Sequence, residues 1–182
     1  MAKKQIILAG VGGQGLVSAG GMLAEAAAIY ERNEALMGCA YGSEARGTFT
    51  KAEVIIDDKR IFFPEVQQPD IVAGLHQTAY DRYAGKLPET ALLVYDSDVI
   101  TPSVEQENQL GVPMSALADA AGAPGRTNMV VLGMISAMDG IVGREPLEKL
   151  ITKKFESKPK LVEMNISALN AGYKYAAKAS EQ

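Results

Sequence analysis

The stretch Gln5-Ile6-Ile7-Leu8-Ala9-Gly10-Val11-Gly12-Gly13-Gln14-Gly15 decides the fold of this chain. Its apolar run has the length of a β-strand, glycines interrupt it, and an alanine-rich helical segment follows at once. A strand, a glycine turn and a helix in this order give a Gly-x-Gly-x-x-Gly string physical meaning, because the helix then begins at free backbone N–H groups. The string predicts an anion-binding turn formed by Gly10, Gly12, Gly13, Gln14 and Gly15.

Three glycines of the string have separate expected roles. We expect Gly10 to take the tight turn and Gly12 to let a ligand approach the backbone. Gly15 is expected to let the helix sit close to the strand, because no Cβ stands between them. The free N–H groups and the positive end of the helix dipole then attract the same negative group.

The rest of the chain alternates between strand-like and helix-like segments. An antiparallel hairpin is expected over residues 48–63, with its turn at Asp57-Asp58-Lys59. The pattern predicts an α/β fold with a three-layer, Rossmann-like, mostly parallel sheet, helices on both faces and this β-hairpin insertion, all within a single domain, 1–182. The other predicted strands are 5–9, 35–41, 70–75, 91–95 and 111–114, and the predicted helices are 13–30, 77–83, 115–121, 128–138, 146–155 and 161–177.

Composition excludes several classes of function. The 182 residues are 47% hydrophobic and carry a net charge of −4, which argues against nucleic acid as the main partner. One cysteine, Cys39, permits no intrachain disulfide, and together with the one histidine it cannot build a metal site alone. No apolar run reaches the length that spans a membrane, so we expect a cytoplasmic protein.

A dinucleotide site requires an acidic residue at the end of the second strand, where it binds the ribose hydroxyls. Residues 36–41 contain none, since Glu31 and Glu34 precede the strand. A nucleotide-hydrolysing loop is also disfavoured, because no Lys-Ser/Thr pair follows the glycines. Two alternatives remain: the glycines serve only close packing, or they bind an anionic or adenine-containing ligand without the usual ribose contact.

A loop bounded by glycines, Gly42 to Gly47, follows the second strand and carries Glu44 and Arg46. These two side chains are either a solvated surface pair or a contact with a partner or a phosphate. Other polar and reactive side chains have structural explanations. We expect Cys39 to be buried and Met129, Met134 and Met138 to fill the core. His76 is expected to begin a helix, and Asn128 to cap one. Asp96 and Asp98 are expected to form a turn and a helix cap.

Three motifs together resemble one family. Gly10-Val11-Gly12-Gly13-Gln14-Gly15, Tyr41-Gly42-Ser43-Glu44-Ala45-Arg46-Gly47 and Asn128-Met129-Val130-Val131-Leu132-Gly133 are similar to the gamma subunits of 2-oxoacid:ferredoxin oxidoreductases. The resemblance covers nearly the whole chain. Residues 44–47 look most like the 2-oxoglutarate branch, while the pyruvate and branched-chain branches stay open.

The resemblance implies a subunit of an enzyme that decarboxylates a 2-oxoacid on thiamine diphosphate, reduces ferredoxin through iron–sulfur clusters and yields an acyl-CoA. It implies that this chain holds no catalytic residue, metal or redox centre and is inactive alone. Its implied partners are alpha and beta subunits, a delta ferredoxin-like subunit and coenzyme A, and the isolated chain is expected to be a homodimer. The alternatives are a stand-alone Rossmann-type NAD-dependent oxidoreductase and a nucleotide- or anion-binding module outside any complex.

The resemblance also assigns roles to residues of the three motifs. The phosphate side of the site would be formed by Gly10, Gly12, Gly13, Gln14 and Gly15. The ligand or partner surface would consist of Tyr41, Gly42, Glu44, Arg46, Gly47 and Asn128.

Overall fold

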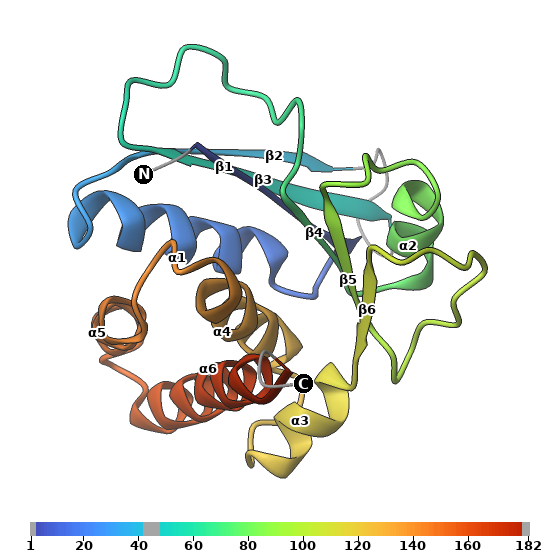
Figure 1. The fold of residues 1–182 in the computed structure, drawn as a ribbon. Helices are drawn as coiled ribbons and strands as arrows, with labels where there is room; N and C mark the ends of the chain where they lie inside the picture. Colours follow the sequence, from blue (N-terminus) through green and yellow to red (C-terminus); the bar gives the residue numbers. More distant parts are fainter. Residues whose placement is uncertain (1–2, 42–47, 180–182) are drawn as a thin grey trace.

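The computed structural model describes residues 3–41 and 48–179. Within these ranges one mixed sheet has the strand order β2-β3-β1-β4-β5-β6, and helices lie on both of its faces (Figure 1). The strands are β1 (Lys4–Val11), β2 (Glu34–Tyr41), β3 (Phe49–Asp57), β4 (Ile71–Gly74), β5 (Leu92–Asp96) and β6 (Gln109–Val112). The helices are α1 (Leu16–Ile29), α2 (Gln77–Tyr83), α3 (Met114–Ala120), α4 (Thr127–Asp139), α5 (Arg144–Lys154) and α6 (Pro159–Ala179).

The sheet is parallel through β1, β4, β5 and β6 and antiparallel at β3, which pairs with β1 on one side and β2 on the other. The strands β1 and β2 run in the same direction, and α1 connects them, but β3 lies between them. This arrangement confirms the predicted α/β fold with a mostly parallel sheet. It differs from an ordinary βαβ unit, in which the two strands are neighbours.

The predicted hairpin was placed on the wrong segment. An antiparallel hairpin is present, but β2 and β3 form it, and residues 60–63 are not a strand. Because β1 and β2 already occupy both edges of β3, no edge remains for residues 60–63 to pair with. Phe62 and Phe63 are instead 78% and 64% exposed on the long loop that leads to β4.

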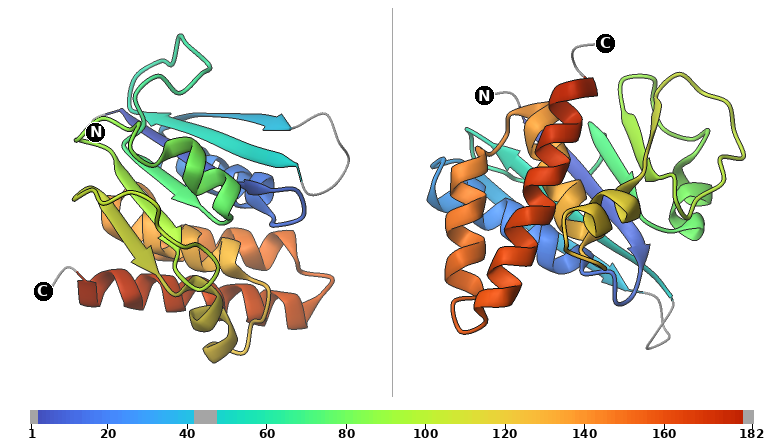
Figure 2. Two further views of the ribbon diagram at one scale, coloured as in Figure 1. Left: turned by 90° about the vertical axis from the view of Figure 1, so that its right-hand side faces the viewer. Right: turned by 90° about the horizontal axis from the view of Figure 1, so that it is seen from below.

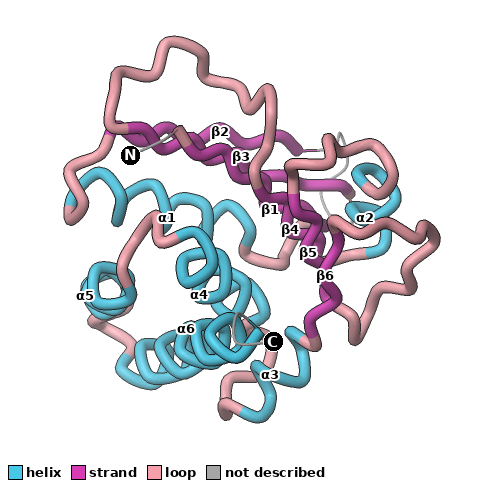
Figure 3. Tube along the Cα trace, in the orientation of Figure 1, coloured by secondary structure: helices cyan, strands magenta, loops and turns pink. Residues whose placement is uncertain are grey.

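Alternate residues of β1 point to the two faces of the sheet. Ile6 and Leu8 belong to the larger core, which α1, α4, α5 and α6 cover, whereas Ile7 and Ala9 pack in a smaller core with α2 (Figure 2). The buried run of β1 is apolar throughout because it lies between both layers. Helices therefore crowd one face, and α2 with the loops covers the other (Figure 3).

The helix α4 is the centre of the helical side and contacts α1, α3, α5 and α6. It crosses α6 at two glycines, Gly133 and Gly172. A Cβ on Gly133 would lie 2.0 Å from the Leu169 carbonyl oxygen, and one on Gly172 would lie 2.0 Å from that of Val130. The helix backbones touch there, so no side chain larger than hydrogen fits at either position.

None of the helices in the described ranges is both long and apolar enough to cross a membrane.

We predict that Gly133→Ala destabilises the protein, because the clash with the Leu169 carbonyl forces α4 and α6 apart. Overpacking of this kind costs about 1–3 kcal/mol, which denaturant unfolding would detect. The matched control is Gly21→Ala in α1, where the nearest atom to a new Cβ is Met37 Sδ at 4.0 Å. That variant should be neutral or more stable, and equal losses in both variants would contradict the close crossing.

Candidate functional site: the glycine turn

The glycine turn lies where the carboxyl ends of the parallel strands meet, the usual ligand edge of an α/β sheet. The strand β1 ends at Val11, and α1 begins at Leu16. The N–H of Gly12 donates to the carbonyl of Thr48 at 3.1 Å, which ties the turn to the start of β3. On the other side, the N–H of Leu75 donates to the carbonyl of Ala9 at 2.9 Å, so β4 also ends here.

The side chain of Gln14 holds the turn closed from inside. Its Oε1 accepts from the Val11 N–H at 2.8 Å, and its Nε2 donates to the Leu75 carbonyl at 2.7 Å. A Cβ on Gly10 would lie 2.1 Å from that Oε1. The expected turn role of Gly10 was therefore wrong, since Gly10 belongs to β1 and its missing side chain makes room for the Gln14 amide.

Gly15 begins α1 in the left-handed region, with φ of 73°. The Nδ2 of Asn128, from the first turn of α4, donates to its carbonyl at 3.2 Å, and a Cβ on Gly15 would lie 2.5 Å from that nitrogen. The missing side chain of Gly15 thus makes room for the Asn128 amide, whereas the sequence predicted that it lets α1 pack close to the strand. The prediction that Asn128 caps its own helix was also wrong, because Arg126 is the N-cap residue of α4 and no side chain caps that helix.

The N-terminus of α1 is open. No side chain caps it, and within the described ranges the N–H groups of Leu16, Val17 and Ser18 have no acceptor. A cavity of about 300 Å³ lies against these groups, lined by Val11, Gly12, Gly13, Gly15, Leu16, Val17, Ser18 and Thr50. Free amides at the positive end of a helix dipole are suited to a phosphate or carboxylate. Neither Ser18 nor Thr50 was predicted from the sequence: Ser18 lies in the first turn of α1, and the pairing of β3 with β1 brings Thr50 to the turn.

The inserted strand β3 removes the usual ribose site. In a dinucleotide-binding fold, the end of the second strand lies beside the glycine turn. Here Phe49 and Thr50 of β3 are the register partners of Val11 and Gly10, and β2 is one strand further out. Two strand spacings are about 9.6 Å, so even an acidic residue at the end of β2 would be far from the turn. The structure thus strengthens the argument against a dinucleotide.

The loop between β2 and β3 begins one strand away from the glycine turn and ends beside it. Tyr41 pairs with Thr50, and Thr48 accepts the hydrogen bond from Gly12, so both described ends of the loop reach the edge that carries the glycine turn. The predicted site residues Gly42, Glu44, Arg46 and Gly47 lie outside the described residues. Their placement at a ligand or a partner stays a prediction.

The structural roles predicted for three other polar residues are confirmed. His76 is the N-cap residue of α2, and its Nδ1 accepts from the Thr78 N–H at 3.2 Å. Asp96 is 2% exposed, and its Oδ1 accepts from the N–H groups of Asp98 and Met114. Asp98 in turn accepts from the Ala116 N–H at 2.7 Å, so both carboxylates join the end of β5 to α3.

Burial was predicted correctly for Met129 and Met134 but not for two other residues. Met138 is 37% exposed near the end of α4. Cys39 was predicted to be buried, but it is exposed because β2 is the edge strand. In residues 3–41 and 48–179, no group of three or more His, Cys, Asp and Glu side chains is placed to hold a metal ion.

Burial perturbs tyrosines that lie away from this turn. Desolvation raises the pKa of the Tyr173 hydroxyl, which donates to the Val142 carbonyl at 3.0 Å. Desolvation likewise raises the pKa of Tyr83, and the negative charge of Glu53 adds to the effect. Both hydroxyls therefore stay protonated at neutral pH.

These features define a class of α/β domain whose first helix begins at open N–H groups and whose described residues include no acidic ribose contact at the end of β2. The model of the family described as pyruvate ferredoxin/flavodoxin oxidoreductase matches residues 5–175. The chain belongs to this family. The resemblance inferred from its motifs is thereby confirmed, and with it the class of protein: a gamma-type subunit of an oxidoreductase.

Individual relatives agree with this assignment. The 2-oxoglutarate synthase subunit KorC of Methanocaldococcus jannaschii is 37% identical over 179 residues, which are 96% of this chain and 94% of the relative. The ketoisovalerate oxidoreductase subunit VorA of Methanothermobacter thermautotrophicus is 33% identical over 94% of this chain, which spans 36% of that longer relative.

Solved structures show the same fold. The gamma subunit of a keto/oxoacid ferredoxin oxidoreductase from Geobacter sulfurreducens has a TM-score of 0.82 and 34% identity, covering 96% of this chain and 99% of its own. The 2-oxoglutarate:ferredoxin oxidoreductase from Magnetococcus marinus has a TM-score of 0.85 at 24% identity, over 98% of this chain and 32% of its own. The fold is therefore found both as a separate chain and inside a longer one.

We predict that Gly15→Ala destabilises the protein in two ways. The left-handed backbone alone costs about 1–2 kcal/mol with a side chain present, and the clash with Asn128 adds to it. In an Asn128→Ala background the clash is gone, so Gly15→Ala should cost less there than in the wild type. Denaturant unfolding of the double-mutant cycle measures the difference, and strictly additive costs would contradict the contact.

Proposed function

We propose that this chain is the gamma subunit of a 2-oxoacid:ferredoxin oxidoreductase that converts 2-oxoglutarate to an acyl-CoA with reduction of ferredoxin. The observation that carries the proposal is the 37% identity to a 2-oxoglutarate synthase subunit along 96% of the chain. Relatives named for ketoisovalerate and for pyruvate are also similar, at 33% and 31% identity, so the choice of oxoacid is a matter for experiment.

The residues of this chain indicate which subunits of the complex hold the cofactors. Its single cysteine and single histidine cannot ligate an iron–sulfur cluster, and the sequence has no thiamine motif. Thiamine diphosphate and the clusters therefore belong to alpha and beta subunits and to a delta ferredoxin-like subunit. This chain acts as one domain, in the cytoplasm, and contributes packing surface and part of a ligand site.

Coenzyme A is the ligand that the glycine turn fits. Its phosphates match the open N–H groups of Leu16, Val17 and Ser18, and the cavity there has a volume of about 300 Å³. Gln14 shapes this site without touching the ligand, because both ends of its amide bond to the chain's own backbone. Arg46, in the loop that starts and ends at this edge, is proposed to bind phosphate, and Glu44 to face the partner subunits.

A stand-alone NAD-dependent oxidoreductase is a weaker hypothesis, because β3 lies between β1 and the strand that would carry the ribose clamp.

When isolated, the chain is proposed to form a homodimer, since it exposes apolar surface such as Phe62 and Phe63. In the assembled enzyme, that surface is available to the partner subunits.

The test is reconstitution of this chain with alpha, beta and delta subunits of a 2-oxoacid:ferredoxin oxidoreductase from the same organism. The complete set should reduce ferredoxin with 2-oxoglutarate and coenzyme A, at a higher kcat/KM than with pyruvate or the branched-chain oxoacid. This chain alone should show no activity, since it has no redox centre. Full activity of the other subunits without this chain, or NAD-dependent activity of this chain alone, would contradict the proposal.

A further inference from the structure

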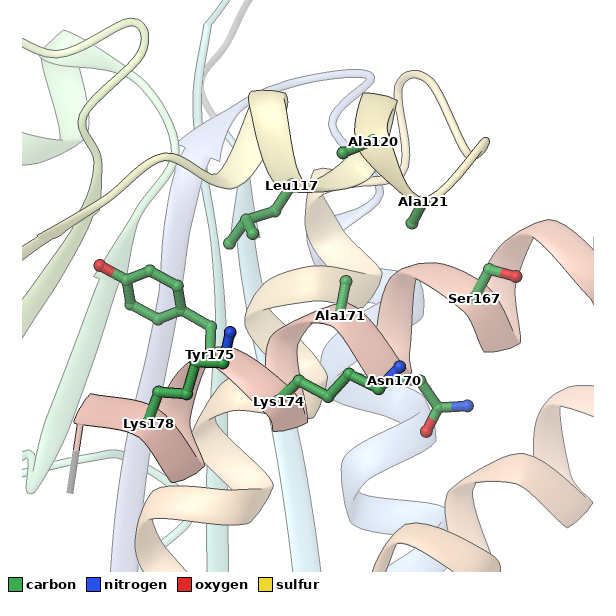
Figure 4. Close-up of a pocket in the computed structure, with 9 residues that line it drawn as sticks. All are labelled: Leu117, Ala120, Ala121, Ser167, Asn170, Ala171, Lys174, Tyr175 and Lys178. Carbon is green, nitrogen blue, oxygen red and sulfur yellow. The ribbon is translucent and has the colours of Figure 1, made fainter. Parts of the chain in front are cut away.

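A second hollow lies between α3 and the C-terminal half of α6 (Figure 4). It is an open groove with a volume of about 520 Å³. Leu117 and Ala120 reach it from α3, Ala121 reaches it from the C-cap position of that helix, and Ala171 reaches it from α6. Three of these four side chains are a single methyl group, so a segment of another protein bound in the groove can come close to both helix backbones.

Two lysines of α6, Lys174 and Lys178, border the groove on the same side, one helical turn apart. Neither has an acidic partner among the residues that the structure describes, and no residue that lines the groove is acidic. Other lysines do have such partners: Lys149 lies 2.7 Å from Glu145, and Lys154 lies 3.1 Å from Glu25.

The helix dipole does not account for both lysines. Lys178 is in the last turn of α6, where a cation interacts favourably with the negative end of the dipole. Lys174 lies one turn earlier and gains little from that effect. The pair therefore forms a local cationic border on a chain whose net charge is −4.

We propose that this groove docks an amphipathic acidic helix of a partner subunit. The inference rests on the proposed function, because it requires the complex. The lining of α6 runs from Ser167 to Lys178, which is about 16 Å or three turns of helix. A helix laid along it would place small apolar residues on the alanines and two carboxylates, one turn apart, at Lys174 and Lys178.

Other occupants fit less well. Two-fold pairing of the groove with that of a second copy would bring four lysines together with no acid between them. For a small anion, the groove offers ammonium groups but no open helix start, because it is formed by the sides of two helices. Carboxylates spaced along a helix match the two lysines, and this match gives specificity more than affinity.

The experiment uses the reconstituted complex with a photoreactive benzoylphenylalanine at Ala171, and separately at Ala120 on the opposite wall. Both positions should crosslink to one partner subunit, within a helical segment that carries Asp or Glu four residues apart. A crosslink to a second copy of this chain, to a segment without such acids, or to nothing in an intact complex would overturn the proposal.

A charge-reversal variant supplies an independent measurement. Lys174→Glu with Lys178→Glu should weaken subunit association about tenfold or more, because two attractions become repulsions. Lys153→Glu with Lys160→Glu changes the net charge equally on exposed lysines outside the groove and should have little effect. Circular dichroism checks that both variants fold, and equal association of the two would also overturn the proposal.

Failure of the groove proposal is distinct from failure of the proposed function. If the unmodified chain does not assemble with the other subunits, the function is wrong. If it assembles but neither the crosslinks nor the charge reversal gives the expected result, the groove alone is wrong.

Discussion

The two hydrogen bonds of the Gln14 amide are the constraint on which the site depends. They join the end of β1 to the end of β4 from beneath the turn, through the Val11 N–H and the Leu75 carbonyl. Gly10 has no side chain, so that the amide fits. Because the turn is held from inside, the N–H groups at the start of α1 stay open toward the cavity, an arrangement suited to a negative group.

The second constraint is the antiparallel strand β3. It takes the position next to β1 that the second strand of a dinucleotide fold would occupy, and it brings Thr50 to the glycine turn. We therefore propose that the same glycine string serves a different ligand in this fold, because β2, which would carry the ribose contact, lies one strand further out. Function here comes from the arrangement of the site and from its partners, and the string of glycines alone does not determine it.

Much of the fold was predictable because its signals are local. The buried run 70–75 and the segment 77–83 predicted β4 and α2 closely, since apolar length and polar breaks decide such elements. Strand pairing was not predictable, because residues 60–63 are as strand-like in sequence as a real strand, and only the folded sheet shows that β1 and β2 occupy both edges of β3. The contact of Asn128 with Gly15 joins residues 113 apart, and no local pattern reports it.

In the function proposed for this chain, the open N–H groups of the turn bind the phosphates of coenzyme A. Hydrogen exchange in the reconstituted complex, with and without coenzyme A, measures this directly at residues 12–18. We predict that coenzyme A slows exchange at Leu16, Val17 and Ser18, because their N–H groups gain acceptors. Unchanged exchange there, with coenzyme A bound and protection found only in other subunits, would contradict the claim.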